Sequence, residues 1–324
     1  MSLDLRLMAV AIALGGRSRA LSQPNPNVGC VIIKDGHIVG RGWTQAGGRP
    51  HAEAMALAEA GVEAHGATAY VSLEPCAHAS SRGPSCAGLL TIAGISRVVI
   101  GRTDPDPRTN GKGIAALEGA GISVKSEVMA ATATASMAGW LMQMAQKRPF
   151  VTLKLATSLD GCIATVAGES QWITGEAARA HSHMIRSRSN LIIVGRGTYD
   201  ADAPRLDVRL AGLEARSPTR TILSTKNETP QGWERLDRPE AITHHPAHYA
   251  LIEGGAGAAA AFLHADLVDR LLLYRAPILI GGGKACLGDI GLESLGQAHG
   301  RWRMSDARRL GDDGLEVYDR VRGI

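Results

Sequence analysis

Three residues with metal-binding side chains, His51, Cys76 and Cys86, constrain this chain more than any other feature of its sequence. One imidazole and two thiolates can hold Zn²⁺ in three of its four tetrahedral positions and leave the fourth for water. Bound zinc lowers the pKa of such a water to roughly 7. Glu53, two residues after His51, is placed to carry a proton from that water. We therefore expect a catalytic zinc site in which Glu53 is the catalytic residue.

The residues around these ligands alternate between helix and strand patterns. Residues 51–61 are rich in Ala, Glu, Leu and Met, which predicts a helix that begins at His51. Residues 68–75 predict a strand, and Cys86 opens a second short helix. The start of a helix favours the thiolate form of a cysteine. Two helix starts and the turn between them can therefore bring the three ligands together.

A structural zinc site with four protein ligands is the alternative, and His78 is the residue that could supply the fourth ligand. Glu53 beside His51 favours catalysis instead. His-x-Glu followed by Pro-Cys and a further Cys is the pattern of zinc-dependent nucleobase deaminases. The usual spacing of the two cysteines is short, whereas nine residues lie between Cys76 and Cys86.

The loop over residues 23–27 leads into a predicted hairpin over 29–43. Two prolines restrict the backbone of this loop. Asn27 can present its amide to the edge of a base, so we interpret the loop as a base-recognition element. A rigid turn without ligand contact is the alternative.

A second series of helix and strand patterns begins after Lys147, and 324 residues suit two domains. We expect α/β domains at 1–147 and 148–324, with one continuous helix over 129–146 before the boundary. The other predicted helices span 3–15, 86–94, 113–121, 176–188 and 258–267. The other predicted strands span 97–101, 122–128, 150–156, 190–195, 219–225, 249–255 and 270–283.

The composition excludes several classes of protein. A net charge of +4 is too small to indicate a nucleic-acid partner, although it suits anionic small molecules. No stretch reaches the roughly 18 apolar residues that a membrane span needs. Asp4 and Arg6 interrupt the apolar start of the chain, which fits an amphipathic helix better than a signal peptide. Five cysteines form no secreted disulfide pattern, and we expect a cytoplasmic protein.

Several motifs taken together resemble one family, the bifunctional riboflavin-biosynthesis deaminase/reductases. The likeness covers nearly the whole chain, with both halves in the order of that family. In the first half it rests on residues 24–29, 51–53, 73–76 and 104–107, together with Cys86. In the second half it rests on residues 154–156, 158–161, 168–174, 195–198, 202–206 and 253–255.

This resemblance implies a cytidine-deaminase-like three-layer α/β/α domain followed by a dihydrofolate-reductase-like α/β domain. It implies one Zn²⁺ in the deaminase domain and hydrolytic removal of the 2-amino group of 2,5-diamino-6-(5-phosphoribosylamino)pyrimidin-4-one. It further implies reduction of the ribosyl group to ribityl by NADPH. We also expect a homo-oligomer, either a dimer or a tetramer.

The resemblance carries roles to individual positions of the second half. Positions expected to bind NADPH are Ala156, Trp172, Thr198, Asp202, Thr225, Gly255, Ala256 and Gly257. Positions expected to bind substrate are Lys154, Ser170, Arg186, Leu206, Arg209 and Glu253, besides Asn27 in the first half.

Elementary chemistry supports some of these roles. The turn over 253–257 follows a strand and opens a helix, so its N–H groups can hold a phosphate. Arg186 and Arg209 suit the substrate phosphate, although a solvated arginine is the alternative. Trp172 could instead be a half-buried core aromatic.

The sequence departs from the family pattern at two places. The loop 77–85 lacks the usual Pro-Pro, and Cys162 stands where the family usually has a basic residue. The second departure keeps open a deaminase with a weak or absent reductase. A polynucleotide base deaminase, or a non-catalytic chain with a structural zinc site, are further alternatives.

Overall fold

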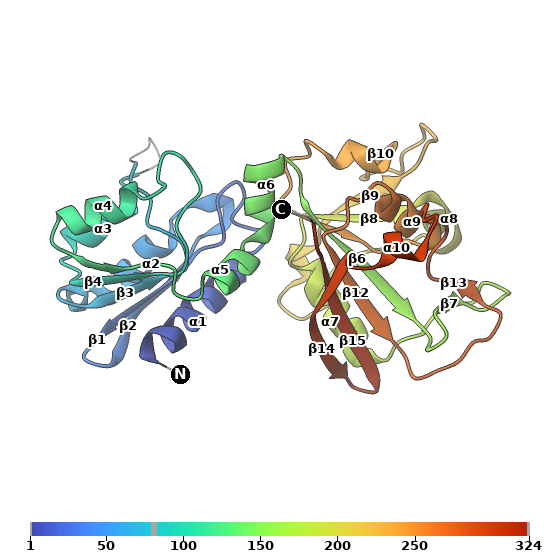
Figure 1. Cartoon of the computed structure of the whole chain (residues 1–324), viewed down its shortest axis with the longest axis horizontal. Helices are drawn as coiled ribbons and strands as arrows, with labels where there is room; N and C mark the ends of the chain where they lie inside the picture. The colour runs from blue at the N-terminus through green and yellow to red at the C-terminus, as the bar shows by residue number, and fades with distance from the viewer. Residues whose placement is uncertain (1, 79–82, 323–324) are drawn as a thin grey trace. The chain divides into compact units, whose positions relative to one another are not determined.

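The computed structural model describes residues 2–78 and 83–322. The chain divides into an N-terminal unit, Met1–Gln146, and a C-terminal unit, Lys147–Ile324 (Figure 1). This division falls one residue before the expected boundary. None of the described helices combines the length and the apolar composition that crossing a membrane requires.

The described part of the N-terminal unit contains a five-stranded sheet flanked by helices. In chain order its elements are α1 (Leu3–Gly15), β1 (Gly29–Lys34), β2 (His37–Trp43), α2 (Ala52–Ala60), β3 (Thr68–Val71), α3 (Cys86–Ile92), β4 (Arg97–Ile100), α4 (Lys112–Gly119), β5 (Ser123–Lys125), α5 (Ala130–Ser136) and α6 (Ala138–Gln146). The strand order is β2-β1-β3-β4-β5. β1 pairs antiparallel with β2 and β3, and β3, β4 and β5 are parallel.

Helices cover both faces of this sheet, which confirms the three-layer α/β/α prediction. On one face Met8 and Ile12 of α1 pack with Val31, Tyr70 and Val99 of the strands. On the other face the core is formed by α2, α3 and α4 together with β1, β3 and β4. Figure 1 shows α1 and α5 on the opposite side of the sheet from α3 and α4.

Glycines in β2 allow α2 to lie directly on the strand backbone. A Cβ atom at Gly40 would lie 2.1 Å from the carbonyl oxygen of Ala56, and one at Gly42 would lie 2.1 Å from that of Ala52. Only glycine permits such an approach without displacement of the backbone. The helix that carries His51 and Glu53 at its start is therefore seated on the sheet by main-chain contact.

The prediction of one continuous helix over 129–146 is wrong. Two helices, α5 and α6, are separated at Met137, whose φ of −114° and ψ of 25° are not helical. The carbonyl oxygen of Ser136 accepts a hydrogen bond of 3.1 Å from the Asn27 side chain. A distant side chain thus binds this carbonyl at the end of α5, a tertiary contact that helix propensity does not reveal.

The described part of the C-terminal unit contains an eight-stranded sheet in the order β10-β9-β8-β11-β6-β12-β15-β14, and β7 pairs with β13 separately. Its elements are β6 (Phe150–Thr157), β7 (Cys162–Ala164), α7 (Glu176–Arg186), β8 (Leu191–Gly195), α8 (Arg196–Asp202), β9 (Thr219–Leu223), β10 (Glu234–Leu236), β11 (Tyr249–Ile252), α9 (Ala256–His264), β12 (Arg270–Arg275), β13 (Lys284–Ala285), α10 (Leu295–Ala298), β14 (Trp302–Leu310) and β15 (Asp313–Arg320). Six neighbouring strands, from β10 to β12, are parallel, and β15 and β14 are antiparallel.

The helices α9 and α7 pack on this sheet. Phe262 of α9 lies in a core with Val151, Leu153 and Ile193. Ala178 of α7 lies in a separate core with Tyr274. An α/β architecture for the second half is therefore confirmed.

Two strand predictions in this unit need correction. The strand predicted over 270–283 ends at Arg275, since Pro277 and a run of glycines follow. The hairpin of β14 and β15 was not predicted at all. Most residues of β14 are exposed, so its sequence lacks the apolar alternation that marks a half-buried strand.

Candidate active sites

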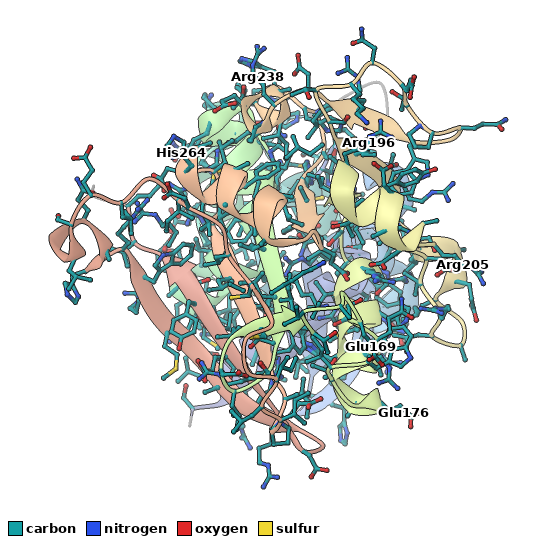
Figure 2. All side chains as sticks on the ribbon, turned by 90° about the vertical axis from the view of Figure 1, so that its right-hand side faces the viewer. Glu169, Glu176, Arg196, Arg205, Arg238 and His264 are labelled. Atoms are coloured by element: carbon teal, nitrogen blue, oxygen red, sulfur yellow. The ribbon has the colours of Figure 1, made fainter. Side chains whose placement is uncertain are left out.

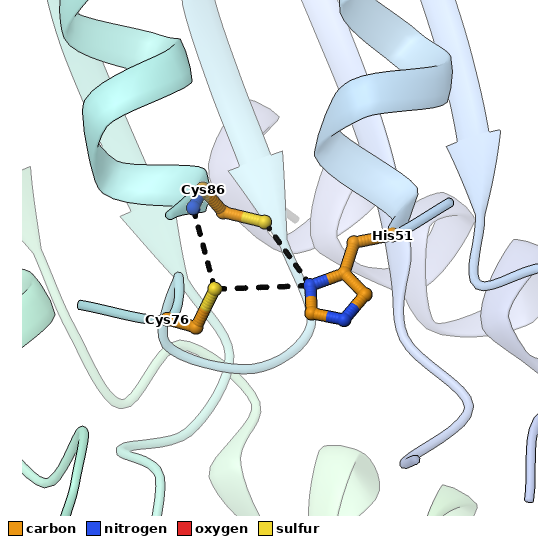
Figure 3. Close-up of side chains that lie close together, drawn as sticks. All are labelled: His51, Cys76 and Cys86. Atoms are coloured by element: carbon orange, nitrogen blue, oxygen red, sulfur yellow. Dashed lines mark hydrogen bonds between the residues drawn. The ribbon is translucent and has the colours of Figure 1, made fainter. Parts of the chain in front are cut away.

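His51, Cys76 and Cys86 lie at the ends of neighbouring elements and face one another (Figure 3). His51 is the N-cap residue of α2, and Cys86 is the first residue of α3. Nδ1 of His51 lies 3.2 Å from Sγ of Cys86 and 3.8 Å from Sγ of Cys76. The backbone N–H of Cys86 donates to the sulfur of Cys76 over 3.3 Å. The structure therefore brings together the three residues expected to bind metal.

The donor set fits zinc, because one imidazole nitrogen and two sulfurs lie within 4.8 Å of one another. Among the described residues this metal-binding cluster contains three members, and His78 is not one of them. Nδ1 of His78 lies instead 3.5 Å from Oγ1 of Thr109. Three protein ligands leave a coordination position for water, as in catalytic zinc sites.

The two cysteines share a proton unequally. A hydrogen bond from Cys86 lowers the pKa of Cys76 to about 4, and the same contact raises the pKa of Cys86. A divalent cation binds both sulfurs as thiolates and therefore displaces the remaining proton.

Glu53 lies in the first turn of α2 and is 3% exposed. Together with His51 and Cys76 it lines a cavity of about 370 Å³. Burial raises the pKa of Glu53. A raised pKa makes a carboxylate a stronger base toward a bound water, which suits Glu53 to accept a proton and return it.

Two aspartates form a further part of the cavity wall, which we call the acidic wall. It includes Asp104 and Asp106 from the Asp-Pro-Asp-Pro motif, and Arg49 and His78 also line the space. Burial raises the pKa of Asp104 to about 6. Asp106 is paired with Arg108 at 2.5 Å. Sequence reasoning used this motif only for the family resemblance and assigned no role to either carboxylate.

Asn27 and Asn25 occupy different surroundings. Asn27 is buried, bonds to Ser136 and is not among the residues that line the cavity. Asn25 does line it, and its Nδ2 atom lies 2.9 Å from Nε2 of His51 and 3.0 Å from the carbonyl oxygen of Gly48. The prediction passed over Asn25, which lies between Pro24 and Pro26 in the same loop.

Part of the long loop between the cysteines, residues 79–82, lies outside the described residues. The expected effect of its unusual sequence on substrate contacts therefore stays a prediction.

The C-terminal unit contains a larger cavity, of about 570 Å³. Its wall includes Gly195, the last residue of β8, and Glu253, which follows β11. These two strands are parallel, so the cavity lies at their carboxyl ends, where α/β folds bind nucleotides. The expected positions that line it are Lys154, Ala156, Ser170, Trp172, Arg186, Thr198, Asp202, Leu206, Arg209, Glu253, Gly255, Ala256 and Gly257. Thr225 and Cys162 are not among its lining residues, whereas Ile163 and Ala164 are.

A buried ion cluster forms part of this wall. Nε and Nη2 of Arg186 donate to the two carboxylate oxygens of Glu253 at 2.8 and 2.9 Å. Nζ of Lys154 lies 3.8 Å from the same carboxylate. Burial opposes ionisation of Glu253, but the two cations lower its pKa. The bidentate Arg186 hydrogen bonds expected for a substrate phosphate are therefore made to Glu253 instead.

Arg209 remains the more accessible arginine of the pair, with 52% of its side chain exposed. Arg205, nearby in the chain, is 78% exposed, and its side chain lies at the surface in Figure 2. Trp172 is 63% exposed and stacks under the guanidinium of Arg179 at 5.1 Å, which excludes a half-buried core aromatic.

The turn at the start of α9 carries glycines in close contact with α8. The N–H of Gly255 donates to Oγ1 of Thr198 over 2.8 Å, so this donor is occupied. A Cβ atom at Gly254 would lie 2.8 Å from that of Ala258. The turn therefore presents bare backbone to the cavity.

Comparisons with known proteins agree with both halves. Residues 1–102 match the cytidine and deoxycytidylate deaminase zinc-binding region, and residues 149–247 and 240–315 match the RibD C-terminal domain. The chain is 37% identical to riboflavin biosynthesis protein RibD of Escherichia coli, over 96% of this chain and 97% of that protein. It is 34% identical to RibD of Aquifex aeolicus, over 98% of this chain and 99% of that protein.

Solved structures agree as well. Acinetobacter baumannii RibD superposes with a TM-score of 0.86 at 34% identity, over 98% of this chain and 99% of that one. A Thermotoga maritima diaminohydroxyphosphoribosylaminopyrimidine deaminase/5-amino-6-(5-phosphoribosylamino)uracil reductase gives a TM-score of 0.87 at 29% identity, with the same coverage. These likenesses confirm the deaminase-like and reductase-like folds of the two halves. The chain belongs to the RibD family of bifunctional deaminase/reductases of riboflavin biosynthesis.

Proposed function

We propose that the N-terminal unit hydrolyses the 2-amino group of 2,5-diamino-6-(5-phosphoribosylamino)pyrimidin-4-one, and that the C-terminal unit then reduces the ribosyl group of the product to ribityl with NADPH. The observation that carries the proposal is the three-ligand cluster of His51, Cys76 and Cys86 with buried Glu53 beside it. The deaminase and reductase activities named for the Thermotoga maritima protein support this choice of substrate.

In the deaminase site His51, Cys76 and Cys86 would hold zinc. When bound, the ion lowers the pKa of a coordinated water. Glu53 would take one proton from the water and pass it to the ring nitrogen as the water oxygen bonds to the ring carbon. It would then carry the second proton of that water to the amino group, whose bond to the carbon breaks, so that a carbonyl and ammonia are formed. Asn25 and the acidic wall at Asp104 are placed to hold the ring and its substituents.

In the reductase cavity the cofactor supplies the hydride. The turn at Gly255–Gly257, together with Thr198 and Trp172, would hold the nucleotide. Its backbone lacks bulky side chains and fits a close phosphate approach, with the N–H of Gly255 already bonded to Thr198. Lys154 and Glu253 face the same space and would orient the substrate. We assign most of this catalysis to positioning.

One paired assay tests the proposal. Ammonia release from the pyrimidine and NADPH oxidation with the deaminated product are measured on the same purified chain. We expect both activities. Absence of ammonia release from zinc-loaded protein would refute the first assignment, and absence of NADPH oxidation at saturating cofactor would refute the second.

A further inference from the structure

Glu74 has no part in the deaminase chemistry described above, yet it is one of the most constrained carboxylates of the chain. Its side chain is 3% exposed. Oε2 accepts backbone hydrogen bonds from Asp104 and Gly111 at 3.1 and 3.0 Å. Oε1 accepts from Gly113 and Ile114 at 2.9 and 3.2 Å. Four donors occupy the acceptor positions of a carboxylate, so Glu74 is not free to transfer a proton.

These four donors belong to two parts of one segment. Gly111 is the N-cap residue of α4, and Gly113 and Ile114 lie in its first turn. The first N–H groups of a helix have no partner within the helix, and the helix dipole favours a negative charge there. The fourth donor, Asp104, begins the acidic wall of the deaminase cavity. A single carboxylate thus holds both ends of the segment 104–114.

The segment that carries Glu74 also contains the metal ligand Cys76. Glu74 lies two residues before Cys76. A Cβ atom at Gly113 would lie 2.1 Å from the carbonyl oxygen of Pro75. The start of α4 is therefore pressed against the segment that ends in the ligand Cys76.

We propose that Glu74 is a positioning residue for deamination, which fixes the acidic wall at Asp104 relative to the metal ligand Cys76. The wall and the ligand come from segments about thirty residues apart, and Glu74 joins them through its hydrogen bonds. Substrate that binds the acidic wall is thereby held at a fixed position relative to the reacting water. This inference rests on the proposed deaminase substrate.

The test is Glu74→Gln, measured by deaminase kinetics, zinc content and NADPH oxidation. In the variant, the amide NH2 replaces one carboxylate oxygen and faces the two backbone N–H groups that donated to it. These two hydrogen bonds are lost, and part of the segment 104–114 is released. We expect KM for the pyrimidine to rise roughly 10- to 100-fold with zinc still at one per chain. The reductase of the same chain should stay unchanged. Glu118→Gln, an exposed change on α4, is the matched control and should leave KM as it is.

A second variant keeps the inference falsifiable if Glu74→Gln folds poorly. Gly113→Ala strains the same junction through Pro75 and leaves every carboxylate in place. It should raise KM in the same way. A KM within twofold of wild type at full zinc occupancy, in whichever variant folds, overturns the positioning role. A general folding defect would instead lower kcat and zinc content together at constant KM. Failure of the wild-type chain to deaminate the pyrimidine refutes the proposed function itself.

Discussion

The cavities at the two candidate active sites differ in the chemistry of the groups that line them. The N-terminal cavity gathers groups suited to metal binding and proton transfer, namely the thiol of Cys76 and the carboxyl groups of Glu53 and Asp104, whose pKa values burial raises. The C-terminal cavity is larger, about 570 against 370 Å³, and combines a buried ion cluster of two cations and one carboxylate with bare glycine backbone. A site that must move protons supplies its own acids, whereas one that borrows a hydride mainly has to hold two molecules. The predictions below use each cavity as the reference for the other.

Removal of zinc should separate the two activities completely. We expect a chelator to abolish ammonia release, because no other described group can lower the pKa of water in that cavity to the same extent. NADPH oxidation with the deaminated product should persist. Added Zn²⁺ should restore deamination. A parallel loss of both activities would show that the sites are not independent.

Glu53→Gln should lower deaminase kcat by about 10²- to 10⁴-fold, since the amide cannot carry a proton. Zinc content and NADPH oxidation should not change. Glu59→Gln, on the exposed side of the same helix, is the control. Deamination at the wild-type rate in a zinc-loaded Glu53→Gln chain would contradict the role given to this residue.

Arg186→Lys should affect the other cavity only. Lysine cannot reproduce the two parallel hydrogen bonds to Glu253. We expect reductase kcat/KM to fall roughly 10- to 100-fold and ammonia release to stay constant. Arg205→Lys, at the surface, provides the comparison and should have little effect. An unchanged reductase in Arg186→Lys would mean that the ion cluster contributes only to folding.

The smallest expected effect is on stability of the N-terminal unit. Arg97 and Lys125 bind the Asp4 carboxylate, and the hydrogen bonds from Arg97 lower its pKa most. The folded-state pKa lies below the unfolded value of about 3.9. The stabilisation is therefore complete above that value and is lost as pH falls through the folded-state pKa.

Asp4→Asn should accordingly reduce the free energy of unfolding by about 1 kcal/mol at pH 7, a modest value because solvent weakens partly exposed pairs. The difference from wild type should shrink below about pH 4. Urea titrations of wild type and variant at pH 7 and at a pH below about 4 measure this difference in the free energy of unfolding. If the difference in the free energy of unfolding is the same at the two pH values, the charge of the carboxylate is not its cause.

The sequence was sufficient for the parts of the site that depend on local elements. His51 and Cys86 begin helices whose composition is plainly helical, so their approach could be predicted. Asn25 could not be separated from Asn27, because the two amides differ in a contact with Ser136, more than a hundred residues away. The same contact lies at the unpredicted break between α5 and α6.

In the second half, motif matches brought nearly all expected positions to one cavity. They did not show that Arg186 is engaged by Glu253, because sequence gives the type of a side chain and not its partner. β14 was missed for a related reason. A strand exposed along most of its length follows the pairing of β15 and not an apolar pattern.

The seat of α2 on β2 has a practical consequence for anyone selecting variants of this chain. Gly42 carries no functional group and is not among the residues that line the deaminase cavity. Any side chain placed there would nevertheless displace the backbone of Ala52, between His51 and Glu53. In a mutational scan it would therefore score like a catalytic position. Libraries meant to broaden deaminase specificity should leave Gly42 unchanged and vary the cavity wall instead.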